Sequence, residues 1–193
     1  MKKTIKSLAI LVLAVVVTSA FTNYKGEKKQ VKIESSKVVW KGYKVLGSHE
    51  GTVQLKSGVL EFDNDKLTGG EFVIDMTSLV STDLEGKDSK PKLEAHLKSD
   101  DFFGVEKYPT SSLVFTKVKA SGKNAYDVTG DLTIKGKTHA VTFTMSIYGS
   151  KATASLKIDR TKFDIQYASS NFFDNLKEKA IYDEFDIVAD LEF

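Results

Sequence analysis

Cysteine is absent from this sequence, and its absence removes three kinds of chemistry together. Disulfide bonds, thiolate metal sites and cysteine nucleophiles all require a cysteine sulfur. Only two prolines occur, Pro91 and Pro109, and both lie outside the stretches that alternate like strands. The protein must therefore be stabilised by the packing of its side chains, with few breaks in its extended segments.

The sequence also lacks an apolar run long enough to span a bilayer, which requires about 20 residues. The run Leu8–Val17 has only ten apolar residues. Three lysines precede it, and the small residues Thr18 and Ala20 follow it. This three-part order is typical of a secretory signal peptide, and a short membrane anchor is the less favoured alternative.

These observations predict the organisation of the chain. We expect residues 1–20 to be a signal peptide, 21–30 a polar leader, and 31–193 a single domain. The mature protein would then be periplasmic or secreted after cleavage of the signal peptide.

Neither sign of charge dominates once residues 1–20 are removed. Three of the 28 Lys and Arg residues lie there, and none of the 26 Asp and Glu residues does. The mature chain then has 25 basic and 26 acidic side chains, a formal charge of −1. Without a broad positive field, we expect no nucleic-acid partner and no stable insertion into a membrane.

Apolar and polar residues alternate with a period of two along most of the remaining chain. In VTFTMSIYG, the apolar residues Val141, Phe143, Met145 and Ile147 alternate with polar ones, as expected for a half-buried strand. The same period occurs in EFVIDM (71–76), YDVTGDLTI (126–134), ATASLKI (152–158) and FDIVADLEF (185–193). The class is therefore all-β.

Short turns separate these segments, for example DND at 63–65 and KGK at 135–137. Connections of this length join antiparallel strands, since parallel strands need a dozen or more residues between them. We expect about eight strands, arranged as a sandwich or a closed barrel. Charged residues on the polar faces argue against an outer-membrane barrel, whose outer face is apolar.

One stretch interrupts this pattern with a helix. In SKPKLEAHLKS, Ser89 is a candidate N-cap, Pro91 fits the first turn, and Leu93 and Leu97 share a face. A helix of about ten residues is marginal alone, so it must pack on something. The aromatic turn SDDFFG follows, with Gly104 at its end. We expect the helix and this turn to cover one end of the barrel.

Three segments carry a resemblance to a known family. KLEAHLKSDDFFGVEKYPT, then GDLTIKGKTHAVTF, then IDRTKFDI resemble the YceI-like family, and the resemblance covers nearly all of 31–193. It implies a lipocalin-like antiparallel barrel whose lumen holds a polyisoprenoid or a related long apolar molecule. The family is not defined by a catalytic motif, so the resemblance implies no catalytic residue.

The resemblance also implies that inward-facing side chains line the ligand. The expected lumen residues are Trp40, Phe72, Ile74, Phe102, Phe103, Leu132, Phe143, Met145, Leu156, Ile158, Phe172, Phe185 and Ile187. His96, Arg160 and Tyr167 are candidate contacts to a polar head group. For Arg160, the only arginine, a structural ion pair at a strand end is the favoured alternative.

Other chemistry finds little support in the sequence. His49, His96 and His139 have no metal-ligand spacing, so we expect no metal and no cofactor. No G-x-S-x-G, phosphate-binding loop or H-E-x-x-H occurs. The leading hypothesis is a protein that carries or sequesters an isoprenoid or quinone-like lipid. A self-packed structural barrel is the alternative, an enzyme is less favoured, and a homodimer is left open.

The signal-peptide assignment makes the first testable prediction. The exported protein should begin at Phe21, because cleavage after Ala20 follows the small-residue rule. Intact-mass spectrometry of the exported protein measures this directly. Recovery of a species that retains residues 1–20 from the membrane fraction would contradict the prediction.

Overall fold

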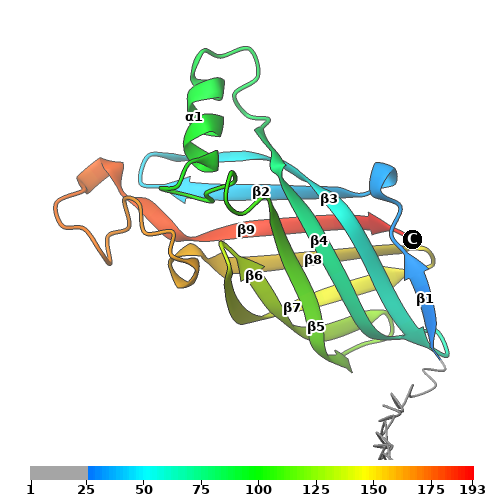
Figure 1. Cartoon of the computed structure of the whole chain (residues 1–193). Coiled ribbons are helices and arrows are strands. Elements are labelled where there is room, and N and C mark those ends of the chain that lie inside the picture. Colours follow the sequence, from blue (N-terminus) through cyan, green and yellow to red (C-terminus); the bar gives the residue numbers. More distant parts are fainter. Residues whose placement is uncertain (1–25) are drawn as a thin grey trace, which may run out of the picture.

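The computed structural model describes residues 26–193, and its main body is a closed antiparallel barrel (Figure 1). Each strand pairs with the next along the chain, and the last pairs with the first of the series, which closes the sheet. The eight strands are β2 (Lys37–Lys44), β3 (Gly47–Asp63), β4 (Lys66–Ser81), β5 (Thr110–Ala120), β6 (Ala125–Ile134), β7 (Lys137–Tyr148), β8 (Lys151–Asp159) and β9 (Ile181–Glu192). The expected all-β barrel is confirmed, and the sandwich is excluded.

Alternation along each strand sets which residues face inward. In β8, Ala152, Ala154, Leu156 and Ile158 are buried, while each residue between them is exposed. β6 shows the same pattern over its ten residues. Because successive side chains of a strand point to opposite faces, the apolar set lies inside the barrel and the polar set meets water.

The seam between β2 and β9 closes the barrel and carries a polar contact on its outer face. The Tyr43 hydroxyl donates to Asp186 Oδ2 over 2.6 Å, and Lys157 Nζ donates to Asp186 Oδ1 over 3.1 Å. These contacts, the tyrosine bond above all, hold the pKa of Asp186 below its usual value. The carboxylate therefore joins three neighbouring strands in its ionised form.

The chain enters the sheet earlier than the sequence predicted. Residues 27–30, assigned above to a polar leader, form β1 (Glu27–Gln30), which pairs with β3 from Glu27–Phe62 to Gln30–Val59. β3 is long, and β2 pairs only with its residues 47–53. β1 therefore pairs with the part of the β3 edge that β2 leaves open. The 3-10 turn η1 (Ile33–Ser35) connects β1 to β2. The predicted signal peptide lies outside the described residues.

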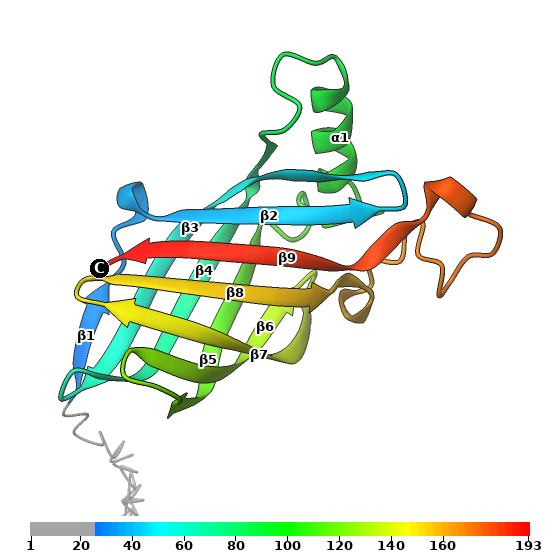
Figure 2. The ribbon, with the colours of Figure 1, turned by 180° about the vertical axis from the view of Figure 1, so that it is seen from behind.

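The two ends of the barrel differ. The lower end carries the tight β3–β4, β5–β6 and β7–β8 hairpins and a packed group, the lower core, of Leu60, Phe62, Leu67, Tyr126 and Val128. The other end, the mouth, carries the β2–β3 hairpin, the segment 82–109 and the segment 160–180 (Figure 2). Two further 3-10 turns, η2 (Arg160–Phe163) and η3 (Lys177–Lys179), lie in the second segment.

The helix α1 (Ser89–Lys98) lies at the mouth, as expected (Figure 1). Its N-cap is Asp88, one residue before the predicted Ser89, and no side chain caps it. Gly104, with φ of +56°, accepts two backbone hydrogen bonds and donates one to Ser99, which turns the chain back. Among the described residues, no helix has the length and apolar character needed to cross a membrane.

Candidate functional site

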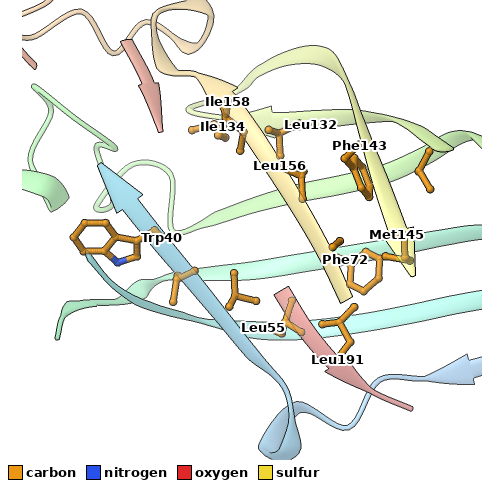
Figure 3. Close-up of a cluster of buried hydrophobic side chains, with 14 of the residues drawn as sticks. Trp40, Leu55, Phe72, Leu132, Ile134, Phe143, Met145, Leu156, Ile158 and Leu191 are labelled. Atoms are coloured by element: carbon orange, nitrogen blue, oxygen red, sulfur yellow. The ribbon is translucent and has the colours of Figure 1, made fainter. Parts of the chain in front are cut away.

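The barrel encloses a cavity of about 180 Å³ between the mouth and the lower core. Its walls are almost entirely apolar, and the polar groups among them belong to Ser111, Arg160 and Tyr182. Figure 3 shows Trp40 at one end of this apolar cluster and Phe72, Phe143 and Met145 at the other. The Ser111 hydroxyl is already used, since it contacts Met76 Sδ at 3.3 Å.

Twelve of the thirteen predicted lumen residues do line the cavity. They are Trp40, Phe72, Ile74, Phe102, Phe103, Leu132, Phe143, Met145, Leu156, Ile158, Phe185 and Ile187. Most come from strand positions where period-two alternation fixes the direction of the side chain. Their contact with a ligand stays a prediction.

Phe172 is the exception, and its assignment to the lumen is wrong. Its side chain is about half exposed, at 50%, and does not line the cavity. The N–H groups of Phe172 and Phe173 both donate to Ser169 O. Asn171 Nδ2 donates to Asp183 Oδ2 over 2.6 Å. This turn is tied to Asp183 at the start of β9, and the ring of Phe172 is left half exposed to water.

Trp40 closes the upper wall between β2 and β4. Its indole N–H donates to Val80 O over 3.2 Å, across the intervening strand β3. The indole ring lies over Gly51, where an added Cβ would meet Trp40 Cζ2 at 2.7 Å and Val80 O at 1.9 Å. Only glycine fits this position, because any side chain would displace the ring or the backbone of β4.

An aromatic group, here called the mouth cluster, borders the cavity at its upper end. It consists of His96, Phe102, Phe103, Tyr167 and Phe185. Edge-to-face contacts join His96 to Phe102 at 5.0 Å and to Tyr167 at 4.5 Å between ring centroids. Phe103 meets Phe185 at 6.3 Å, also edge-on. Segments distant in sequence therefore meet in one aromatic cluster. Edge-to-face packing is a preferred arrangement of aromatic pairs.

Arg160 lies below this layer and is only 3% exposed. Its guanidinium donates to three backbone carbonyls: Nη1 to Ile165 O at 2.7 Å, Nη2 to Ile181 O at 2.9 Å, and Nε to Tyr182 O at 3.0 Å. Nη2 also lies 3.4 Å from Asp183 Oδ1. The side chain therefore ties the segment after β8 to the start of β9, the structural role favoured above.

The electrostatics of this group follow from its burial. Burial lowers the pKa of the Arg160 guanidinium. The carboxylates of Asp183 and Asp159 offset this only in part, so the pKa stays below its usual value. An arginine stays protonated under these conditions. Its carbon Cζ is 5.9 Å from the centroid of Phe102, so the charge also faces an aromatic ring at the cavity wall.

The other two predicted head-group contacts lie outside the main cavity. His96 and Tyr167 border a separate groove of about 550 Å³ at the mouth, together with Lys44, Phe173 and Lys179. Ile181 borders both spaces, so the groove adjoins the upper end of the cavity. The structure thus places Arg160 in the cavity wall and His96 and Tyr167 at its entrance.

Sequence reasoning missed several lining residues. Leu113 and Phe115 of β5 line the cavity, but Val114 between them is also apolar, so the period of two is obscured in SSLVFTKVK. Leu97 of α1 also lines it, consistent with the apolar face expected for that helix. Ile165 had no such signal, because it follows a 3-10 turn and is fully buried only through the fold.

Titratable groups elsewhere form pairs with structural roles. His49 Nδ1 is 2.8 Å from Asp83 Oδ2, and the Ser81 hydroxyl donates to Asp83 Oδ1. Burial raises the pKa of Asp83, but these two hydrogen bonds outweigh it and leave the pKa below its usual value. Among residues 26–193, no three His, Asp or Glu side chains are arranged to hold a metal ion.

Comparison with known proteins agrees with this geometry. The profile of the YceI-like domain matches residues 24–193. The chain belongs to the YceI-like family. A UPF0312 protein of Pseudomonas putida (strain W619) is 33% identical over 151 residues, which cover 75% of this chain and 73% of that relative. One from Pseudomonas fluorescens (strain SBW25) is 33% identical over 155 residues, covering 77% and 74%.

Solved structures of similar fold include BcnA of Burkholderia cenocepacia. It is 25% identical, with a TM-score of 0.62, covering 83% of this chain and 98% of BcnA. A polyisoprenoid binding domain from Saccharophagus degradans is 12% identical, with a TM-score of 0.55, covering 84% and 95%. The barrel is therefore the lipocalin-like fold of YceI-like proteins.

In this YceI-like chain, replacing Arg160 by lysine should loosen the mouth. A lysine ammonium cannot reach the three carbonyls that the planar guanidinium reaches together, so buried acceptors lose their donors. We expect a loss of about 2–4 kcal/mol in the free energy of unfolding. Denaturant midpoints and hydrogen exchange of the 165–183 amides measure both effects. Lys162→Ala, an exposed change in the same turn, is the control. Equal midpoints and exchange in Arg160→Lys and Lys162→Ala would contradict the prediction.

Proposed function

We propose that this protein binds a long apolar ligand, of the polyisoprenoid or isoprenoid-quinone type, in the barrel lumen and carries or sequesters it outside the cytoplasm. The observation that carries the proposal is the cavity itself. A folded barrel that needed only its own core would gain stability by filling this space, since each void forfeits packing contacts. A cavity with apolar walls suits an apolar chain.

The energetics favour burial as the whole mechanism. Removing a methylene from water contributes about 0.8 kcal/mol, so a chain of many carbons gains affinity without any catalytic group. The likeness to the polyisoprenoid binding domain from Saccharophagus degradans supports this class of ligand. On this proposal the protein is not an enzyme and uses no cofactor.

A polar head would lie at the mouth. Arg160 directs its bonds to the backbone, so His96 and Tyr167 are the better placed of the three candidates to meet a head group in the adjoining groove. The alternative that the sequence left open is a self-packed barrel with a structural or partner-binding role, and the dense lower core supports it. The two proposals differ in whether the cavity is occupied.

Protein purified from its native host should carry an apolar lipid. Extraction with organic solvent and mass spectrometry of the extract should recover one class of long-chain lipid, in near-stoichiometric amount. Phe143→Asp places an unpaired charge in the cavity wall, which opposes burial of an apolar chain, and should lose this lipid. A wild-type protein without lipid that also fails to take up isoprenoid alcohols would favour the self-packed barrel.

Truncation of the mouth aromatics separates a ligand contact from scaffold. Phe102 is 7% exposed, so Phe102→Ala should cost about 3–5 kcal/mol, and Phe103→Ala less because Phe103 is only partly buried. We expect at least one variant to lose more bound lipid than its denaturant midpoint explains. Phe172→Ala, at the exposed ring, should change neither quantity. Unchanged lipid in both variants, with lowered midpoints, would make the turn scaffold alone.

A further inference from the structure

The lumen is open only over its upper part. The lower core is buried, with Leu60 at 0% and Val128 at 1% exposed, yet none of its five side chains lines the cavity. Along β6, the cavity is lined by Leu132 and Ile134 but not by Tyr126 or Val128 nearer the lower end. The cavity therefore has a floor part-way down the barrel.

Three phenylalanine rings contribute to that floor. Phe72 of β4 and Phe115 of β5 have centroids 5.6 Å apart, and Phe115 and Phe143 of β7 have centroids 5.7 Å apart. All three rings line the cavity. Figure 3 places Phe72 and Phe143 together at the end of the apolar cluster away from Trp40. These rings, Phe72, Phe115 and Phe143, are here called the floor trio, and Met145 lines the same end of the cavity beside them.

The neighbouring strands have glycines where two of these rings lie. A Cβ at Gly58, the pairing partner of Phe72, would lie 2.9 Å from Phe72 Cδ1. A Cβ at Gly70 would lie 2.9 Å from Phe115 Cε2. The two rings therefore occupy the space that a side chain at Gly58 or Gly70 would need. The rings are seated against the backbone, so the floor is a built feature with a set height.

We propose that the floor trio sets the length of chain that the lumen accepts. The inference rests on the proposed function, since it concerns how far a bound apolar chain can descend. On β8 the lining runs from Ile158 near the mouth to Ala154, a span of about 13 Å along the strand. Isoprene units that fit above the rings are buried and add affinity. Units beyond that length stay at the mouth and add little.

A chain-length series tests this on delipidated full-length mature protein. The fluorescent probe N-phenyl-1-naphthylamine is displaced by geraniol, farnesol, geranylgeraniol and geranylfarnesol, which differ by one isoprene unit each. For the wild type, affinity should rise with each added unit and then level off. Phe143→Ala should move the levelling point to the next longer alcohol, raising affinity for that alcohol about tenfold relative to the shorter one.

Two further variants keep the test decisive. Phe143→Leu retains an apolar side chain and should shift the series in the same direction. It replaces the alanine variant in the test if that variant folds poorly. Phe62→Ala removes a ring of equal size from the lower core, where Phe62 contacts Phe193 at 5.5 Å. It should lower the denaturant midpoint and leave the chain-length profile unchanged, because the floor above it remains.

The outcomes distinguish this inference from the proposed function. If the wild type binds the alcohols but neither Phe143 variant changes the profile, the floor trio does not set the length. The same conclusion follows if Phe62→Ala shifts the profile as far as Phe143→Ala does. If no alcohol displaces the probe from the wild type, the proposed function fails, and the length inference fails with it.

Discussion

Closure of a single sheet on itself is the constraint on which the rest of this structure depends. The pairing of β2 with β9 gives every strand of the barrel two neighbours and leaves the inward apolar face nowhere to lie except around a common interior. An open sheet with the same alternation would expose that face to water. The common interior and its apolar walls follow from this one set of hydrogen bonds, while the side chains of the lower core fill one end.

Within the closed sheet, pairs of an aromatic ring and a glycine give the lumen its shape. Trp40 lies over Gly51 near the mouth, Phe72 lies against Gly58, and the ring of Phe115 lies at Gly70. In each pair the missing side chain on one strand makes room for a ring from another. The rings thus take set positions, one closing the upper wall and two contributing to the floor. A barrel with alanine at these glycines would have to move the rings, and the open volume would change with them.

The mouth is organised by a different kind of interaction. Arg160 is the only arginine of the chain, and its bonds to three backbone carbonyls hold the segment after β8 against the start of β9. Ile165 O lies in irregular backbone, and Ile181 O and Tyr182 O lie at the start of β9, where its pairing with β2 shifts register. The guanidinium donates hydrogen bonds to these three carbonyls, and its Cζ lies 5.9 Å from the centroid of the Phe102 ring. These bonds explain the Arg160 guanidinium in an apolar wall without a ligand. His96 and Tyr167 border the adjoining groove, where a head group could contact them.

The sequence by itself determined which side chains face inward, because the direction of a side chain along a strand is a local property with a period of two. Phe143, Leu156 and Ile187 were assigned correctly on that basis, and the helix over 89–98 followed from local punctuation. Tertiary structure alone decided that the sheet closes, that residues 27–30 pair with β3, and that Phe172 faces water while Phe102 is buried. The two FF turns differ in their surroundings: Phe102 and Phe103 line the cavity, whereas the turn of Phe172 is tied to Asp183 by Asn171 and leaves that ring half exposed. The depth of the cavity was also hidden, since it depends on rings from β4, β5 and β7 meeting across distances that no local pattern encodes.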